Sequence, residues 1–272
     1  MRPTSSAAWP IRTLDEHIAV ITQAIEECRK DPTEHAVHRL RTTSRRIEAQ
    51  LALLRLCAEV PRLRHTGRLR RLLKLLRQRA GKVRDFDVQM ESLESLRPPR
   101  RGAQWKHDQQ LLIDRLKTKR KKAVVRLTRD LHQHDDDLTT RLAELTAQLK
   151  SQEAFSLEPQ LLMRSATTWF QDQAFIRQGG FDDPARLHAI RKAAKLARYM
   201  GENAAKTRNA ARRFAEDMET LQEAGGAWHD CLALAGVAAK YAGTKSSLTL
   251  NLQSRCTRLL KAYQRLLRQA AA

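Results

Sequence analysis

The amino-acid sequence predicts an all-α protein that contains a duplicated helical unit. Of its 272 residues, 42% are apolar and 30% are charged, a balance typical of globular proteins with a real core. Aromatic residues make up only 5%, with 10 Gly and 8 Pro, which favours helices over strands. Apolar residues recur at helical spacing along almost the whole chain, and one pattern of histidine and basic residues occurs twice.

Turn-forming segments divide the chain into about ten predicted helices. Residues 1–12 contain no apolar run and are expected to form an N-terminal arm, and helical patterning occupies residues 13–269. The predicted breaks are residues 31–33 (DPT), Pro61, Gly81, 97–102 (RPPRRG), 132–137 (HQHDDD), 179–184 (GGFDDP), 225–226 (GG) and 242–247 (AGTKSS).

Two of the predicted helices have recognisable start signals. Asp31 and one of Asp182 or Asp183 precede helical patterns and are expected to be N-caps, since a carboxylate there accepts from free backbone N–H groups. Pro32 and Pro184 follow at early helical positions, where the missing N–H of proline costs nothing.

The first repeated element joins a histidine to basic residues. His38 and His188 are 150 positions apart, and the same offset pairs Arg41 with Arg191 and Arg45 with Lys195. Two ordered copies in one helical register indicate an internal duplication.

A second repeated element follows the first in each half. Residues 76–85 (LRQRAGKVRD) align with residues 221–230 (LQEAGGAWHD), which pairs Gly81 with Gly226 and Asp85 with Asp230. Each glycine is expected to end or bend a helix, with each aspartate in the first turn of the next helix, where the helix dipole favours it. Alternatively, each aspartate orients an arginine or histidine of a basic site.

Positive charge is concentrated in one part of the chain. The formal net charge is +21, and residues 37–129 alone hold 27 Lys/Arg against 8 Asp/Glu, a net of +19. Such a field attracts polyanions. The candidate ligands are nucleic acid, anionic lipid and phosphate polymers.

The basic residues form stripes on amphipathic helices. On a helical wheel with His38 at zero, Arg41 and Arg45 lie at about −60° and −20°, while the apolar Ile47 lies at about 180°. The candidate binding residues are His38, Arg41, Arg45 and Arg46 in the first copy, and His188, Arg191, Lys192, Lys195, Arg198 and Tyr199 in the second. A third stripe, on residues 111–131, contributes Lys119, Lys122 and Arg126, with Arg115 in the same register.

Arginine and lysine in rows suit phosphate, because guanidinium groups bind its oxygens bidentately and lysine adds point charge. A neighbouring histidine can donate a hydrogen bond to phosphate and gains charge as the anion arrives. The alternatives are that the stripes are solvated helix faces, and that each histidine makes only a helix-terminal hydrogen bond.

Other features narrow the class of protein. No apolar run approaches the length of a membrane span, and the first residues lack the apolar core of a signal peptide, so a cytoplasmic protein without membrane insertion is expected. Cys28, Cys57, Cys231 and Cys256 lie far apart without a C-x-x-C motif, which favours free thiols over disulfides or a metal site. We expect no cofactor.

At these residues the sequence resembles the CHAD family, named for its conserved histidine in an α-helical domain. The resemblance covers residues 13–269, with Glu48 standing where the family usually has arginine. The matching residues are His38, Arg41, Arg45, Arg46 and Ile47, then Leu76, Gly81, Arg84 and Asp85, and in the second copy His188, Arg191, Lys192, Lys195, Arg198, Tyr199, Gly226 and Asp230.

The resemblance implies two antiparallel four-helix bundles, 13–150 and 155–269, related by a pseudo-twofold axis around a basic groove or pore. It also implies that the protein binds inorganic polyphosphate and associates with polyphosphate granules. Family members are often joined to a triphosphate-hydrolysing domain marked by E-x-E-x-K, which this sequence lacks. The chain is therefore expected to be a stand-alone binding module.

Two other functions stay open at this stage. Nucleic acid would be attracted by the same field, although the stripes offer little aromatic surface for stacking beyond Tyr199. An enzyme is disfavoured, because no P-loop occurs and no carboxylates cluster in the sequence with His38 or His188 to hold a catalytic metal.

Overall fold

The structure is a computed structural model that describes residues 11–57, 62–99, 102–151, 159–174, 180–205 and 209–271. These residues form helices without any strand, which confirms the predicted all-α class. In chain order the helices are α1 (Ile11–Lys30), α2 (Glu34–Leu56), α3 (Thr66–Glu94), α4 (Ala103–Gln133), α5 (Asp135–Lys150), α6 (Pro159–Ala174), α7 (Pro184–Ala205), α8 (Asn209–Tyr241) and α9 (Ser247–Ala271).

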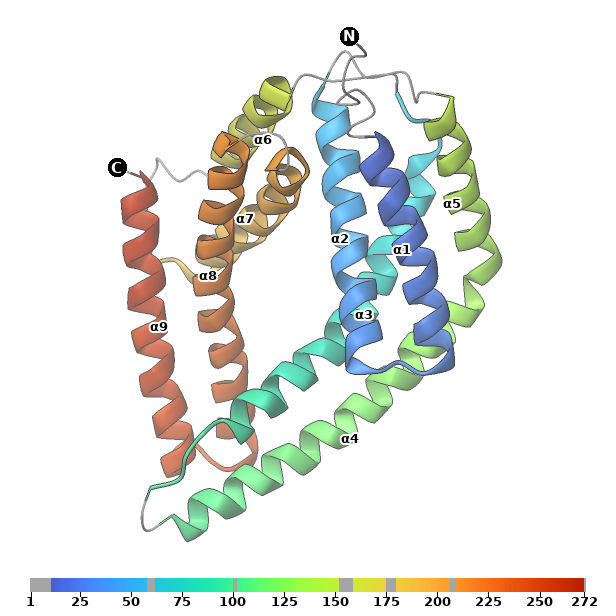
Figure 1. The fold of residues 1–272 in the computed structure, drawn as a ribbon. Helices are drawn as coiled ribbons and strands as arrows, with labels where there is room; N and C mark the ends of the chain where they lie inside the picture. Colours follow the sequence, from blue (N-terminus) through green and yellow to red (C-terminus); the bar gives the residue numbers. More distant parts are fainter. Residues whose placement is uncertain are drawn as a thin grey trace.

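The helices fall into two groups that touch each other (Figure 1). Helices α1, α2, α3 and α5 lie alongside one another, and α6 to α9 form the second group. Helix α5 follows α4 after His134 alone and continues it in a new direction, so the first half has five helical segments along a four-helix path. The predicted arm, residues 1–12, falls mostly outside the described residues.

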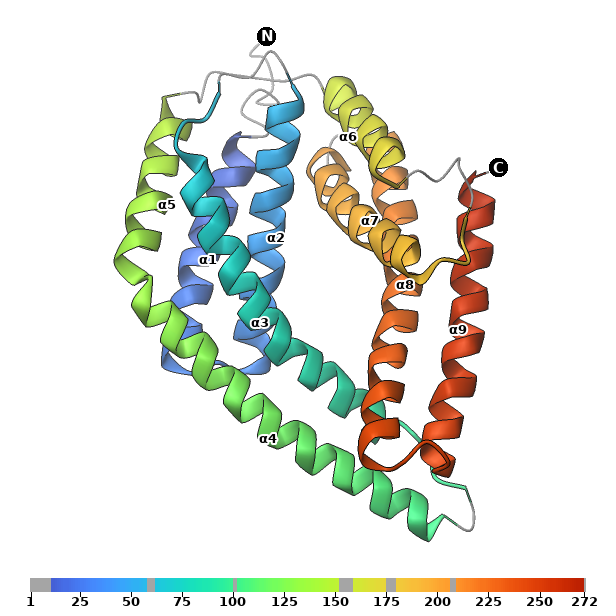
Figure 2. The ribbon, with the colours of Figure 1, turned by 180° about the vertical axis from the view of Figure 1, so that it is seen from behind.

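Two long helices join the halves (Figure 2). The C-terminal part of α3 and the N-terminal part of α4 extend away from the first group toward the lower ends of α8 and α9. Helix α3 packs against α8, and α4 packs against both α8 and α9. One apolar core accordingly includes Leu76 of α3 and Leu127 of α4 together with Leu234 of α8 and Leu252 of α9. The boundary predicted at 150–155 lies between α5 and α6 but does not divide this core.

The start of α7 follows the predicted capping chemistry, and the start of α2 does not. Asp183 caps α7 by accepting a hydrogen bond from the backbone N–H of Ala185 at 2.9 Å, and Pro184 is the first residue of that helix. Helix α2 is capped by Thr33, whose hydroxyl accepts from the N–H of Ala36 at 3.2 Å. The N-cap expected at Asp31 and the early helical position expected for Pro32 are therefore wrong, since α2 begins at Glu34 and Thr33 is the residue next to its first turn.

The helix breaks predicted at Gly81 and Gly226 are also wrong. Helix α3 runs without interruption through Gly81, and α8 runs through Gly225 and Gly226. A glycine inside a helix costs only about 1 kcal/mol relative to alanine, which the burial of apolar side chains on both sides offsets. Asp85 and Asp230 consequently lie in the middle of long helices.

Candidate anion-binding site

Helices α2 and α7 pack against each other and bring the two histidine-led repeats together. Residues 41–50 and 191–200 have the same burial class at every position except the pair Thr42 and Lys192. The half-buried positions include Arg41, Arg45, Arg191 and Lys195, which we call the central cluster. Both copies of the repeat therefore contribute cations to one place.

Three guanidinium groups of the central cluster have unused donors. The Nε atoms of Arg41, Arg45 and Arg191 are buried and have no hydrogen-bond partner within the described part of the chain. A buried charged donor without an acceptor costs stability, which is why such groups are normally paired. Donors from both halves of the chain are therefore available to an acceptor with several oxygens.

The electrostatic environment of the central cluster opposes positive charge. Burial, followed by repulsion from Arg41, Arg45 and Arg191, lowers the pKa of Lys195 to about 7, although Asp230 acts in the opposite direction. Burial and then Arg41 lower the pKa of Arg45 to about 10. A negative ligand would reverse both effects.

Two carboxylates stand at the edge of the central cluster. Burial raises the pKa of Asp85 on α3, and Asp230 on α8 raises it further, while Arg41 is the largest of the opposing charges. Asp85 is nevertheless exposed to solvent. Both aspartates raise the pKa of Arg191, Asp230 more than Asp85, although burial lowers that pKa overall.

The sequence predicted Asp85 and Asp230 first as residues in the first turn of a helix, and only alternatively as neighbours of a basic site. Their mid-helix positions rule out the expected capping role and favour the alternative, in which each aspartate neighbours a basic group of the site. Asp230 also lies 3.3 Å from Nδ1 of His229. The equal spacing of aspartate and glycine in both halves was the signal that identified them.

The two histidines flank the central cluster and are driven toward the neutral form. Burial and then Arg84 and Arg41 lower the pKa of His38. Burial and then Arg191 lower the pKa of His188 to about 4, and its ring lies 4.9 Å from that of His229. Among the described residues neither His38 nor His188 makes a side-chain hydrogen bond, so the helix-terminal role is not what the structure shows.

Arg46, Arg198 and Tyr199 form a separate network between α2 and α7. Glu202 accepts from Nε of Arg198 at 2.8 Å and from Nε of Arg46 at 3.3 Å, and Arg198 also pairs with Glu219 at 2.7 Å. Tyr199 is buried, with its ring 5.6 Å from the Arg46 guanidinium and 5.8 Å from that of Arg198. These residues hold the two helices together, and the tyrosine ring is closed to a stacking base.

The remaining predicted residues lie apart from the central cluster. Lys119 of α4 places its ammonium 4.7 Å from the ring centre of Tyr241 on α8. Lys122 and Arg126 are exposed on α4, and no described contact joins them to the central cluster. Lys192 is exposed and close enough to His188 to lower its pKa. Glu48, which stands where the family usually has arginine, is bound by Arg77 of α3.

Because Gly225 has no side chain, Arg191 of the central cluster can pack closely against α8. A Cβ atom on Gly225 would lie 3.1 Å from Cγ of Arg191 and 2.8 Å from Cζ of Tyr263. A Cβ atom on Gly81 would lie 3.5 Å from Nε of Arg41, an ordinary contact distance, and one on Gly226 would meet nothing. Gly225, and not the predicted Gly226, is therefore the glycine that the second copy requires.

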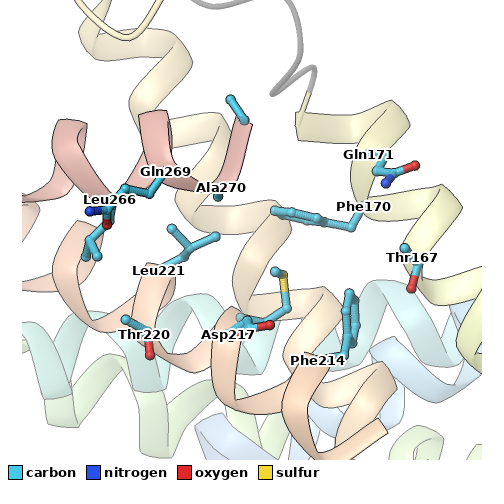
Figure 3. A pocket seen from close by; sticks show the side chains of 12 residues that line it. Thr167, Phe170, Gln171, Phe214, Asp217, Thr220, Leu221, Leu266, Gln269 and Ala270 are labelled. Atoms are coloured by element: carbon cyan, nitrogen blue, oxygen red, sulfur yellow. The ribbon is translucent and has the colours of Figure 1, made fainter. Parts of the chain in front are cut away.

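A cavity of about 610 Å³ lies elsewhere, among α6, α8 and α9 (Figure 3). Phe170, Phe214 and Leu221 are among the residues that line it, and none of its lining residues belongs to the central cluster. The described residues contain no group of three or more histidine, cysteine, aspartate or glutamate side chains arranged to hold a metal ion. Among the described helices, none has the length and apolar character to cross a bilayer.

Comparisons with known proteins agree on one family. A family model described as CHAD domain matches residues 12–239. The crystal structure of the CHAD domain from the plant Ricinus communis has a similar fold, with a TM-score of 0.63 and 19% sequence identity over 94% of this chain and 89% of that chain. No curated protein matches the chain.

Proposed function

Because this chain belongs to the CHAD domain family, we propose that it binds inorganic polyphosphate at the central cluster. The observation that carries the proposal is the set of buried Nε donors on Arg41, Arg45 and Arg191 without acceptors among the described residues. Polyphosphate offers oxygens in every unit of the polymer, and guanidinium groups bind such oxygens bidentately. A chain lying along the packed pair α2 and α7 would meet cations from both halves.

The electrostatics of the free protein support a ligand of high charge density. Lys195 and Arg45 are held close to other cations at a cost that lowers their pKa values. A polymer with about one negative charge per phosphate offsets that repulsion and releases counterions. Nucleic acid is disfavoured because Tyr199, the aromatic residue of the stripes, is buried.

A competition titration tests the proposal. Labelled long-chain polyphosphate bound to the protein is displaced by unlabelled polyphosphate, by triphosphate, and by duplex and single-stranded DNA at matched phosphate concentration and near-physiological salt. We expect polyphosphate to compete at least about 100-fold better than either DNA, because its charge spacing matches the clustered guanidinium groups. Equal competition by DNA, with all affinity lost at modest salt, would indicate a general polyanion binder.

We also propose that binding is not accompanied by catalysis, and that the protein associates with polyphosphate granules in the cytoplasm. Asp85 and Asp230, the two carboxylates beside the site, already neighbour basic side chains. Polyphosphate incubated with the protein and Mg²⁺ is expected to keep its length on a gel. Shortening with time would instead identify a hydrolase.

The affinity for polyphosphate is expected to fall as the pH rises above about 7. Lys195, with a pKa of about 7 in the free protein, must be charged to hold phosphate, so binding above that pH takes up a proton. By linkage the loss of affinity approaches tenfold per pH unit. The neighbours that shift the pKa of Lys195 are Arg41 and Arg45 from α2, Arg191 from α7 and, with opposite sign, Asp230 from α8.

The variant Lys195→Arg is the control for this pH dependence. Arginine keeps its charge throughout the range from pH 7 to pH 9, so the variant should bind with a much flatter pH profile. Isothermal titration in buffers of different ionisation enthalpy measures the proton uptake directly. A wild-type affinity that is constant between pH 7 and pH 9 would contradict the role given to Lys195.

A further inference from the structure

Two of the four cysteines meet at the interface between α8 and α9. Cys231 is buried on α8 and Cys256 is half-buried on α9, and each thiol affects the pKa of the other. The Cys231 thiol also lies 3.5 Å from the backbone oxygen of Leu252, one turn before Cys256. The sequence separation of these cysteines concealed this contact, which exists only because α8 and α9 are packed as neighbours.

We propose that Cys231 and Cys256 are a site of reversible disulfide formation that links α8 to α9. The two residues lie on adjacent packed helices, and the Cys231 sulfur already contacts the turn of α9 that leads to Cys256. A disulfide between them requires the two sulfur atoms to approach to about 2 Å. Cys28 of α1 is fully buried, and Cys57 follows α2 with its Sγ atom 3.9 Å from Oγ of Ser165.

The two thiols differ in a way that suits a stepwise reaction. Cys256 is the more exposed, and the hydrogen bond from Cys231 lowers its pKa, although burial raises that pKa overall. Burial, and then Cys256, raise the pKa of Cys231 to about 11. Cys256 is therefore the thiol that meets an oxidant first, and Cys231 is the partner that resolves it.

With hydrogen peroxide as the oxidant, the reaction balances in two steps. The Cys256 thiolate attacks one peroxide oxygen, the O–O bond breaks, and a sulfenic acid and water result. The Cys231 sulfur then attacks the Cys256 sulfur and displaces the oxygen as a second water molecule. Two thiols and one peroxide become one disulfide and two waters.

A small cavity lies beside Cys231 and also contacts Asp230 of the second repeat. It has a volume of about 170 Å³ and is lined by Cys231, Leu252 and Arg255, by Val88 of α3, and by Asp230 of the second repeat. The space beside the Cys231 thiol admits a molecule as small as peroxide. The same wall carries Asp230, so the disulfide would form one residue away from the candidate anion-binding site.

The experiment uses the full-length protein treated with hydrogen peroxide at pH 8.5 and then digested with trypsin after blocking free thiols. Trypsin cleaves on both sides of Cys256 at Arg255 and Arg258, and it releases Cys231 in the peptide 214–240. We expect mass spectrometry to find these two peptides joined, with two of the four thiols lost and both restored by dithiothreitol. The melting temperature should rise by several degrees, because the cross-link restricts the unfolded chain.

The pH dependence and one variant make the test specific. Because both pKa values are raised, the rate of disulfide formation should increase between pH 7 and pH 9. The variant Cys256→Ser should lose the linked peptide and the thermal shift, whereas Cys57→Ser should keep both. The proposal would be overturned if peroxide joins other cysteines, produces only intermolecular dimers, or leaves all thiols free. The wild-type peptide map gives this answer even if a variant does not fold.

Discussion

Replacing Arg41 and Arg191 together with methionine should abolish tight polyphosphate binding and leave the protein at least as stable as the wild type. Each arginine is expected to contribute a charge-assisted hydrogen bond to phosphate, worth about 1.5–3 kcal/mol. Losing both weakens binding by about 100-fold to 10,000-fold, measured by titration with long-chain polyphosphate. In the free protein the same side chains have buried Nε donors without partners in the described residues, so methionine removes a cost.

The combination of lost binding with retained or increased stability separates a binding role from a structural one. The matched control is Arg265→Met with Arg268→Met, which removes the same charge from the exposed face of α9. That control should change the affinity by less than about threefold at physiological salt, since it alters only the distant field. An unchanged affinity in a folded Arg41→Met/Arg191→Met protein would refute the assignment of the central cluster.

Gly225→Ala is expected to lower the free energy of unfolding by about 1–3 kcal/mol, which is typical of overpacking. The added methyl group would lie 2.8 Å from Cζ of Tyr263 and 3.1 Å from Cγ of Arg191. Tyr263 is fully buried and its hydroxyl donates to the backbone oxygen of Leu187 at 3.3 Å, so the ring cannot move away freely. Displacing Arg191 should also weaken polyphosphate binding.

The neighbouring glycine supplies the control. A Cβ atom on Gly226 would meet nothing within 4 Å, and Gly226 is in the same turn of α8. Gly226→Ala is therefore expected to raise the free energy of unfolding by up to about 1 kcal/mol through helix propensity, without an effect on binding. Urea denaturation of both variants measures the difference, and equal stabilities would show that the close approach of Tyr263 and Arg191 is not a constraint.

The helical register of the basic stripes could be predicted from the sequence because it depends on local geometry alone. A period of 3.6 residues places Arg41 and Arg45 on one face of α2 and Ile47 on the other, whatever the helix packs against. A cap at Asp182 or Asp183 was predicted for the same reason, since capping involves groups within one turn, and the structure shows that Asp183 is the cap. Gly81 and Gly226 were misread because tertiary contacts hold α3 and α8 continuous through them.

Which stripe residues share a site was decided by contacts between helices. Position on a helical wheel treats Arg45 and Arg46 as equal members of one basic face, yet Arg45 joins the central cluster while Arg46 pairs with Glu202. Lys119 fits a basic stripe equally well, but α4 carries it to Tyr241.

The sequence by itself determined the helices, the faces on which cations lie, and the family to which the chain belongs. Only the tertiary structure decided that Arg41, Arg45, Arg191 and Lys195 are half-buried together, that Asp85 and Asp230 stand beside them, and that Cys231 meets Cys256. The physical reason is that helix formation depends on residues within a few positions of one another. Burial, pKa and reactivity instead depend on which distant side chains displace water from a group.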